Sequence, residues 1–389
     1  MGEIPSNVLM LVSQRCWAEV DLDALRQNLA WIRHHAGQDT LVMTVVKADA
    51  YGHGLKQIAA LLMQSGTDIF GVANLTEARA IRSVGKGWPI LMLGACLPHE
   101  IDIAIRENVM ATISSLEEAR AFSLAAAKRK RTARLHVKVD AGMSRLGARP
   151  ESIPELVDQI QRLPSLKLCG LYAHYSSVDS DARLTRRQQR LLVDLSNELR
   201  SSGVTLEHVH CANSGGLLWE PLDACNVVRP GLLVYGVAPP GVRRNASKLK
   251  NQILPAMSLK SRVSFLKYVE KGTQLSYGGT FVTPRRMRIA TLTSGYGDGY
   301  PRAAGNRARV LIGGRRCPVL GHVTMDQTLV DVSRVSNLET GDEAVLLGAQ
   351  GSDAITANDL SKWCDTIPWE ILTRISGRVP RVYRGGHAA

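Results

Sequence analysis

Short apolar runs alternate with amphipathic helical patterns through roughly the first two thirds of the chain. Counting from Leu41, eight of these runs have the length and composition of β-strands. They cover residues 41–47, 69–73, 89–93, 110–113, 134–139, 166–173, 206–212 and 226–228. Strands that alternate with helices predict a parallel sheet, and eight is the strand number of a (β/α)8 barrel. A doubly wound open sheet is the alternative.

The pattern changes near Asn251. From Ile253 onward, short strands with alternating apolar and polar residues follow one another, separated by Gly and Pro, as in antiparallel sheets. We therefore predict an α/β fold, with an N-terminal (β/α)8 TIM-type barrel over residues 15–250 and a C-terminal, mostly antiparallel β-domain over residues 251–389. The alternating segment Trp17–Val20 could pair with the β-domain rather than join the barrel.

The composition is that of a well-cored protein without a membrane span. Hydrophobic residues make up 45% of the 389 residues, and no apolar stretch is long enough to cross a bilayer. The apolar run Val8–Val12 is too short for a signal peptide and has no basic segment before it. We expect a cytoplasmic protein without a membrane partner.

Charge and cysteine content argue against nucleic-acid-binding, disulfide-rich and metal-binding proteins. The formal net charge is +13, but the basic residues are spread out apart from Lys128–Arg131. That cluster follows an Ala-rich helical pattern, where cations suit the helix dipole. The seven cysteines are scattered and form no C-x-x-C pair. We therefore expect no nucleic-acid partner, no disulfide framework and no metal site.

Candidate catalytic and binding residues lie where the predicted barrel strands end. In a barrel, the loops after the strands build the active site, so side chains at these positions converge. The segments concerned begin at Lys47, Asp140, His174, Asn213 and Arg229. The sequence thus predicts one site at the carboxyl ends of the strands.

The lysine that follows the first of these strands has the features of a Schiff-base lysine. The apolar run before Lys47 disfavours a charged amine, which lowers its pKa and makes it nucleophilic. The segment Val46–Gly54, VKADAYGHG, resembles the pyridoxal-phosphate (PLP) lysine motif of alanine racemases. The resemblance implies that Lys47 carries PLP and that Tyr51 contacts the phosphate.

A second segment, HVKVDAGMSRLG from His136 to Gly147, ends another strand. By itself it leaves open a structural salt bridge between Asp140 and Arg145. It resembles the racemase motif K-x-D-T-G-M-x-R-L-G, with Ala141 where Thr is usual. The resemblance implies that Arg145 contacts the PLP phenolate and the substrate carboxylate. Lys138 falls where some family members carry a carbamylated lysine that orients this arginine.

Two further barrel segments concern the cofactor ring. Arg229 belongs to a segment that resembles the family's R-P-G motif, which implies that it faces the pyridine nitrogen of PLP. His210 would then hydrogen-bond Arg229, and His174 would link Arg229 to a catalytic tyrosine. From the residues alone, the R-P-G segment is equally a loop-opening turn, and His174 is a buried structural histidine rather than a metal ligand.

The phosphate of PLP would be bound between these strand ends. The segment HVHCANSGG from His208 resembles H-x-x-N-S, which implies phosphate contacts from Ser214, beside Asn213. The backbone N–H groups of Gly231 and Leu232 would complete the binding. From the residues alone, Asn213 or Ser214 is equally a helix N-cap.

The β-domain carries the remaining motifs. The segment SYGGTF from Ser276 resembles a racemase motif whose tyrosine, here Tyr277, is the second base in the active site of a partner subunit. The segment GHVTMDQ from Gly321 implies that the Met325 amide and Asp326 line the partner's entrance. A homodimer with shared active sites follows. Gly377 lies in the segment ISGRVPR, at a position where some members of the family have a tyrosine.

Taken together, the motifs from Trp17 to Tyr383 resemble the fold-type III, PLP-dependent alanine racemases. The resemblance implies an isomerase in which Lys47 serves D-alanine and Tyr277 serves L-alanine, supplying D-alanine for peptidoglycan. Gly377 also favours a racemase of serine or of several amino acids. A non-catalytic PLP carrier on the same barrel is a further alternative, but such carriers typically lack the β-domain and its tyrosine.

Overall fold

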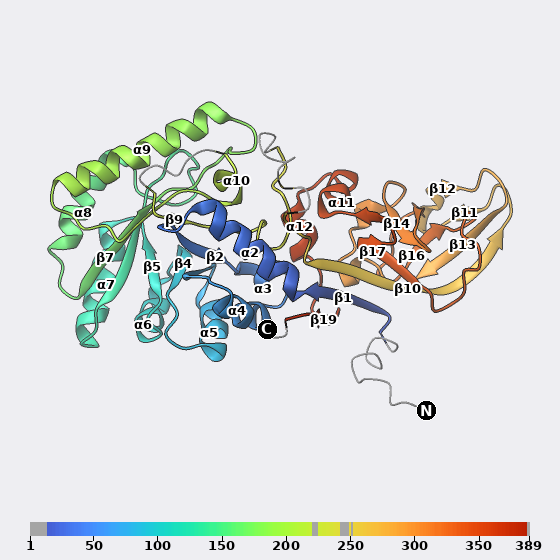
Figure 1. The fold of residues 1–389 in the computed structure, drawn as a ribbon, viewed down its shortest axis with the longest axis horizontal. Coiled ribbons are helices and arrows are strands. Elements are labelled where there is room, and N and C mark those ends of the chain that lie inside the picture. The colour runs from blue at the N-terminus through green and yellow to red at the C-terminus, as the bar shows by residue number, and fades with distance from the viewer. Residues whose placement is uncertain (1–13, 220–224, 242–248, 250–251, 387–389) are drawn as a thin grey trace. The chain divides into compact units, whose positions relative to one another are not determined.

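The computed structural model describes residues 14–219, 225–241, 249 and 252–386 (Figure 1). It contains two compact units. One is Ala24–Leu254, and the other combines Met1–Asp23 with Pro255–Ala389. The apolar run at Val8–Val12 and the junction at residues 250–251 lie outside the described residues.

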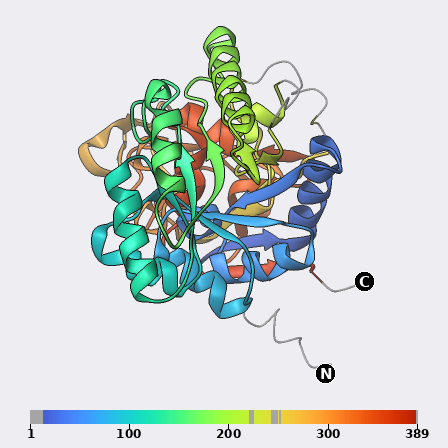
Figure 2. The same ribbon diagram turned by 90° about the vertical axis from the view of Figure 1, so that its left-hand side faces the viewer.

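The first unit is a barrel of eight parallel strands (Figure 2). The strands are β2 Leu41–Val45, β3 Ile69–Val72, β4 Ile90–Ala95, β5 Met110–Ile113, β6 Ala133–Lys138, β7 Leu166–Tyr172, β8 His208–His210 and β9 Val227–Val228. The ring closes where the Asn226 N–H donates to the Val209 carbonyl (3.1 Å) and the Arg229 N–H to the Ala212 carbonyl (2.8 Å). The predicted barrel is confirmed, and the open sheet is excluded.

Amphipathic helices lie outside the strands (Figures 1 and 2). They are α2 Leu22–Ala36, α4 Leu55–Gln64, α5 Leu75–Val84, α6 Ile101–Arg106, α7 Leu116–Lys128, α8 Ile153–Gln161 and α9 Ala182–Ser201, with the short α10 Ser214–Leu217 after β8. Part of the barrel core is a cluster of Met43, Ile69, Leu91, Met110 and Val227. No helix in the described residues is long and apolar enough to span a membrane.

The first barrel strand is shorter than predicted. The apolar run predicted a strand to Lys47, but β2 ends at Val45, and Lys47 opens the short turn α3 Lys47–Tyr51. The four residues after Lys47 have φ between +53° and +55°. This left-handed backbone cannot continue an extended strand. The prediction that Lys47 ends the strand is therefore wrong by two residues.

The second unit is built on a mostly antiparallel nine-stranded sheet. Its strands are β1 Cys16–Asp21, β10 Met257–Val269, β13 Met287–Leu292, β14 Arg309–Ile312, β15 Arg315–Leu320, β16 Thr328–Asp331, β17 Glu343–Gln350, β18 Asp353–Ile355 and β19 Arg381–Arg384. The long strand β10 pairs with both β13 and β17, which closes a ring of strands. Strand β1, which contains Trp17–Val20, pairs with β10 and β19 of this unit.

Short elements complete the second unit. The helices α11 Ala357–Cys364 and α12 Pro368–Thr373 precede β19, and the two-stranded ribbon β11 Gln274–Leu275 and β12 Phe281–Val282 flanks the turn η3 Tyr277–Gly279. A second turn, η4 Tyr296–Asp298, follows β13. Part of the core is a cluster of Val269, Leu275, Met287, Ile289 and Leu320.

Candidate active site

The predicted site residues of the barrel lie beyond the carboxyl ends of its strands. Lys138 is the last residue of β6, and His174 follows β7 by two residues. The amine of Lys47 interacts electrostatically with both Arg145 and Arg229. His174 interacts with these three groups and with Lys138. The structure thus brings side chains from four strand ends, those of β2, β6, β7 and β9, to one place.

Lys47 is followed by a backbone that ordinary residues rarely adopt. Ala48, Asp49, Ala50 and Tyr51 form one left-handed turn. Such a conformation costs about 1–2 kcal/mol per residue without a glycine. Strain of this kind persists only where the surroundings impose it, and it is concentrated at functional sites. We therefore infer that this turn positions the Lys47 side chain.

A carboxylate on α5 holds this turn. Glu77 accepts the Ala48 N–H through one oxygen and the Ala73 N–H through the other, both at 2.7 Å. The Asp49 carboxylate accepts the Leu55 N–H (2.7 Å), which ties the far side of the turn to the start of α4. Two carboxylates thus fix the backbone that carries Lys47.

We expect Glu77→Gln to loosen this turn. A glutamine side chain has one acceptor oxygen, so one of the two exposed N–H groups exchanges its partner for water, at a cost of about 0.5–1.5 kcal/mol. The loss should lower both the unfolding midpoint and the occupancy of the cofactor that the motif predicts on Lys47, measured by thermal unfolding and cofactor absorbance. Glu118 is a matched control, because it accepts two backbone N–H groups after β5. Both N–H groups bond the same Glu118 oxygen, and a glutamine keeps one such oxygen, so Glu118→Gln should change neither property. Equal occupancy in both variants would contradict this role of Glu77.

The amine of Lys47 is prepared for nucleophilic attack. Its pKa is lowered from the usual lysine value, mainly by desolvation and further by the charge of Arg145, while Glu77 partly opposes the shift. The residue as a whole remains accessible to solvent. A lysine with a lowered pKa and an open approach is what covalent catalysis at a carbonyl requires.

Arg229 is a buried cation held in a fixed orientation. Its guanidinium donates to His210 Nδ1 (2.5 Å) and to the carbonyl oxygens of Ala173 (2.8 Å) and Cys211 (3.1 Å). His174 Nδ1 lies 3.3 Å from the same guanidinium. The structure thus places Arg229 between the two histidines that the motifs assigned to it.

A chain of imidazoles extends from this arginine into the barrel. His210 Nε2 lies 3.0 Å from His136 Nδ1, and His136 Nε2 lies 3.3 Å from His208 Nδ1. Burial lowers the pKa of all three rings, so they are neutral near neutral pH. Arg229 can only donate, so His210 Nδ1 must accept. His210 therefore donates its Nε2–H to His136, and His136 donates its Nε2–H to His208. The chain fixes the tautomers and so the orientation of Arg229.

A group of hydrogen-bonding atoms lies around Ser214, beside β8 and β9. The Ser214 hydroxyl oxygen accepts the N–H groups of Gly231 (2.9 Å) and Leu233 (3.3 Å). Gly231 has to be a glycine, because a Cβ there would collide with the Tyr51 hydroxyl. The Leu232 N–H has no acceptor among the residues that the structure describes. These donors have the chemistry of a phosphate site.

Asn213, next to Ser214, has a structural role. Its side chain caps α10 by accepting the Gly216 N–H (2.9 Å). The sequence had left open whether the pair Asn213–Ser214 caps a helix or binds phosphate. In the structure, Asn213 is the cap, and the Ser214 hydroxyl lies against the Gly231 backbone.

Lys138 is a second lysine with a lowered pKa. Burial, Arg229 and Arg145 lower it to about 7. The amine lies 4.5 Å from the centre of the Tyr172 ring, and the Tyr172 hydroxyl bonds Thr112 (2.8 Å). Near neutral pH much of Lys138 is therefore the free amine, the form that reacts with carbon dioxide to give a carbamate and a proton.

The loop that carries Arg145 is shaped by Asp140. One Asp140 oxygen accepts the N–H groups of Gly142, Met143 and Ser144 at 3.0–3.1 Å. The described residues contain no salt bridge between Asp140 and Arg145, so the structural interpretation of this pair is not supported. Arg145 is exposed, and its guanidinium is available for a ligand.

The remaining predicted residues belong to the second unit. Tyr277 opens the turn η3, and its side chain is 74% exposed. Met325 is 54% exposed and lies between β15 and β16, next to Asp326. A tyrosine and a methionine with this much exposed surface are available to contact another molecule.

The two units match two parts of one family. Residues 20–239 match the alanine racemase N-terminal domain, and residues 256–383 match the alanine racemase C-terminal domain. The chain belongs to the alanine racemase family. Its relatives include the alanine racemase of Symbiobacterium thermophilum, which is 41% identical over 95% of this chain and 97% of the relative. The predicted family is therefore confirmed.

Solved structures of alanine racemases share the whole fold. The enzyme from Streptomyces lavendulae superposes with a TM-score of 0.89 at 34% identity, covering 96% of this chain and 97% of that one. The alanine racemase of Bartonella henselae, with covalently bound pyridoxal phosphate, gives a TM-score of 0.85 at 25% identity, covering 95% of this chain and all of that one. Alanine racemases are isomerases that depend on PLP.

Several supporting residues were missed by the sequence analysis. They act through contacts between segments far apart in the chain, as Glu77 and His136 show. Gln188 on α9 is another, since it donates to the Ala141 carbonyl (2.9 Å) and accepts the Ser176 N–H (3.2 Å). The signal for Gln188 is a polar residue on the buried face of an amphipathic helix.

Proposed function

We propose that the chain interconverts L-alanine and D-alanine with PLP held on Lys47. One observation carries the proposal. The lysine with a lowered pKa lies at the strand ends of a barrel whose anchored arginine, Arg229, and phosphate-type donors around Ser214 match the two ends of PLP. Racemisation of alanine is the activity of the family to which the chain belongs.

The residues at the strand ends fit PLP. Lys47 would bind it covalently, Ser214, Tyr51 and the Leu232 N–H would hold its phosphate, and Arg229 would face its ring nitrogen. When bound, PLP withdraws electrons from the Cα–H bond of an attached amino acid and so makes that proton acidic. Arg229 cannot accept a proton, so it keeps the ring nitrogen unprotonated, which limits side reactions such as transamination.

Two bases of the protein would move the proton at Cα. We infer that Lys47 acts on one face and that Tyr277 of a second copy acts on the other. One removes the Cα proton, and the other delivers a proton from the opposite side, which inverts the centre. Tyr277 needs a linked group to act as a base, and His174 beside Arg229 supports such a link. On family precedent, Lys47 serves D-alanine and Tyr277 serves L-alanine.

The substrate carboxylate would be bound by Arg145 and by the Met325 amide of a second copy, whose Asp326 would line the entrance. A guanidinium without a carboxylate partner, such as that of Arg145, is suited to a carboxylate ligand. The lowered pKa of Lys138 supports its carbamylation, and a carbamate there would face the positive charges of Arg145 and Arg229. The homodimer and the cytoplasmic location stay predictions.

The activity can be measured in deuterium oxide. Purified protein with PLP and L-alanine should form D-alanine that carries deuterium at Cα. Both products would be followed by chiral chromatography and mass spectrometry. Conversion to pyruvate, or release of carbon dioxide, would contradict racemisation and indicate transamination or decarboxylation.

Gly377 favours a second candidate function, racemisation of amino acids larger than alanine. Its φ is not left-handed, and a Cβ built on Gly377 has no atom within 4 Å, so a larger side chain fits there. We therefore expect the natural chain to accept serine and lysine as well as alanine. Gly377→Tyr should lower kcat/KM for lysine by about tenfold or more while sparing alanine. Equal loss for both substrates, measured by D-product formation, would contradict this role.

A further inference from the structure

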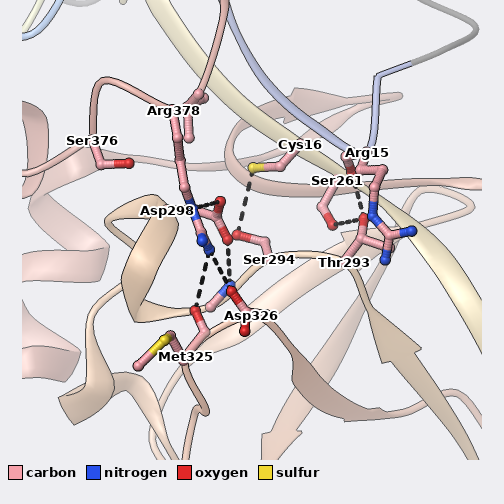
Figure 3. A network of polar contacts seen from close by, with 12 residues as sticks. Arg15, Cys16, Ser261, Thr293, Ser294, Asp298, Met325, Asp326, Ser376 and Arg378 are labelled. Atoms are coloured by element: carbon pink, nitrogen blue, oxygen red, sulfur yellow. Dashed lines mark hydrogen bonds and ion pairs between the residues drawn. The ribbon is translucent and has the colours of Figure 1, made fainter.

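Three loops of the second unit meet at one arginine (Figure 3). The Arg378 Nε donates to Asp298 Oδ1 at 2.8 Å. Its Nη2 donates to Asp326 Oδ1 at 2.8 Å and to the Met325 carbonyl at 3.4 Å. One guanidinium therefore joins the loop after β13, the loop before β16 and the segment before β19.

Asp298 is the buried residue that holds the three loops together. Its second oxygen accepts the Gly295 N–H (2.9 Å), and its carbonyl accepts the Ser376 N–H (3.1 Å). The Gly297 N–H donates to the Met325 carbonyl at 2.8 Å. A Cβ at Gly297 would lie 2.7 Å from Arg378 Nη2 and 3.0 Å from the Met325 oxygen. The loops are therefore packed backbone against backbone, with no room for a side chain between them.

This packing sets the direction of the Met325 amide. The Thr324 carbonyl accepts the Tyr296 N–H at 3.0 Å and so points toward the loop after β13. In a trans peptide the carbonyl and the next N–H point in opposite directions. The Met325 N–H therefore points away from that loop. It has no acceptor among the residues for which the structure gives contacts.

We propose that Arg378 is a positioning residue for the substrate carboxylate: it locks the Thr324–Asp326 backbone so that the Met325 N–H is presented to that carboxylate. The inference rests on the proposed function, in which Met325 contacts the substrate. Arg378 also supplies the positive charge that offsets Asp326. Without it, an unpaired carboxylate next to the donor would repel an incoming carboxylate.

The test compares Arg378→Lys with a matched variant. Lysine keeps the charge but lacks the planar fork that reaches two carboxylates and a carbonyl. Arg316 is the control, because its guanidinium holds Asp353 and the Ala354 carbonyl elsewhere in the same unit. Arg378→Lys should raise KM for alanine by about tenfold or more and change kcat much less. Arg316→Lys should change neither.

Propionate separates positioning from a general structural effect. It has the carboxylate and the methyl group of alanine but no amine. Its inhibition constant should rise in Arg378→Lys by the same factor as KM, with the PLP absorbance unchanged. If Arg378→Lys fails to fold, Gly297→Ala replaces it, because its Cβ displaces the guanidinium and the Met325 carbonyl without removing Arg378.

The outcomes distinguish the two proposals. If the natural chain does not racemise alanine, the proposed function fails. If it does, and Arg378→Lys or Gly297→Ala keeps KM and the propionate constant of the natural chain, the positioning role alone is wrong. A fall in kcat with unchanged KM would also overturn it, because the carboxylate contact would then be intact.

Discussion

Lys47→Ala is expected to abolish both turnover and the absorbance of protein-bound PLP. In the proposed function the lysine is the covalent attachment point and one of two bases, so we expect racemisation to fall by more than about 10⁴-fold. The two losses should appear together, because one amine is responsible for both. Racemisation would be followed by D-alanine formation, and cofactor binding by the visible spectrum after dialysis.

Lys56→Ala is the control for this variant. Lys56 is an exposed lysine, the second residue of α4, and follows the Val46–Gly54 segment by two residues. The Lys56→Ala variant should keep its turnover and its spectrum, since Lys56 bonds none of the site residues that the structure describes. If Lys47→Ala retained either property at the natural level, the cofactor would be attached elsewhere.

Tyr277→Phe is expected to keep the cofactor and lose one direction of proton transfer. The substitution removes only a hydroxyl from a largely exposed side chain, so the fold and Lys47 are unaffected. Removal of the proposed second base should slow racemisation by about 10²–10⁴-fold. In deuterium oxide, L-alanine should lose its Cα exchange, whereas D-alanine should still exchange through Lys47 without inversion.

Tyr268→Phe controls for the loss of an exposed tyrosine hydroxyl. Tyr268 on β10 is 62% exposed, and its ring contacts Arg286. This variant should racemise alanine at the natural rate. Unchanged exchange of L-alanine in Tyr277→Phe would assign the second base to another residue.

Local sequence predicted the fold because most barrel strands lie in short, largely apolar runs that alternate with helical patterns. The same runs placed Lys47, His174 and Arg229 at strand ends, where the barrel brings them together. Periodicity could not predict the left-handed turn after Lys47. Its alanines and tyrosine strongly prefer other backbone conformations, and the turn depends on Glu77, which lies in a different helix.

The supporting contacts escaped prediction for the same reason. His136 and His208 lie on different strands, and only the closed barrel aligns their rings with His210. Asp298 and Arg378 are separated by 80 residues in the chain. The segment ISGRVPR, which contains Arg378, was visible in the sequence, but the partner of this side chain is decided by the packing of loops.

The central claim is that each active site needs Lys47 from one copy and Tyr277 from another. Hybrid dimers of Lys47→Ala with Tyr277→Phe test it directly, when the two variants are co-expressed with different tags and purified on both. Each hybrid would contain one site with both bases and one with neither, so we predict about half of the natural activity per dimer. A hybrid as inactive as its two parent variants would show that both bases belong to a single chain.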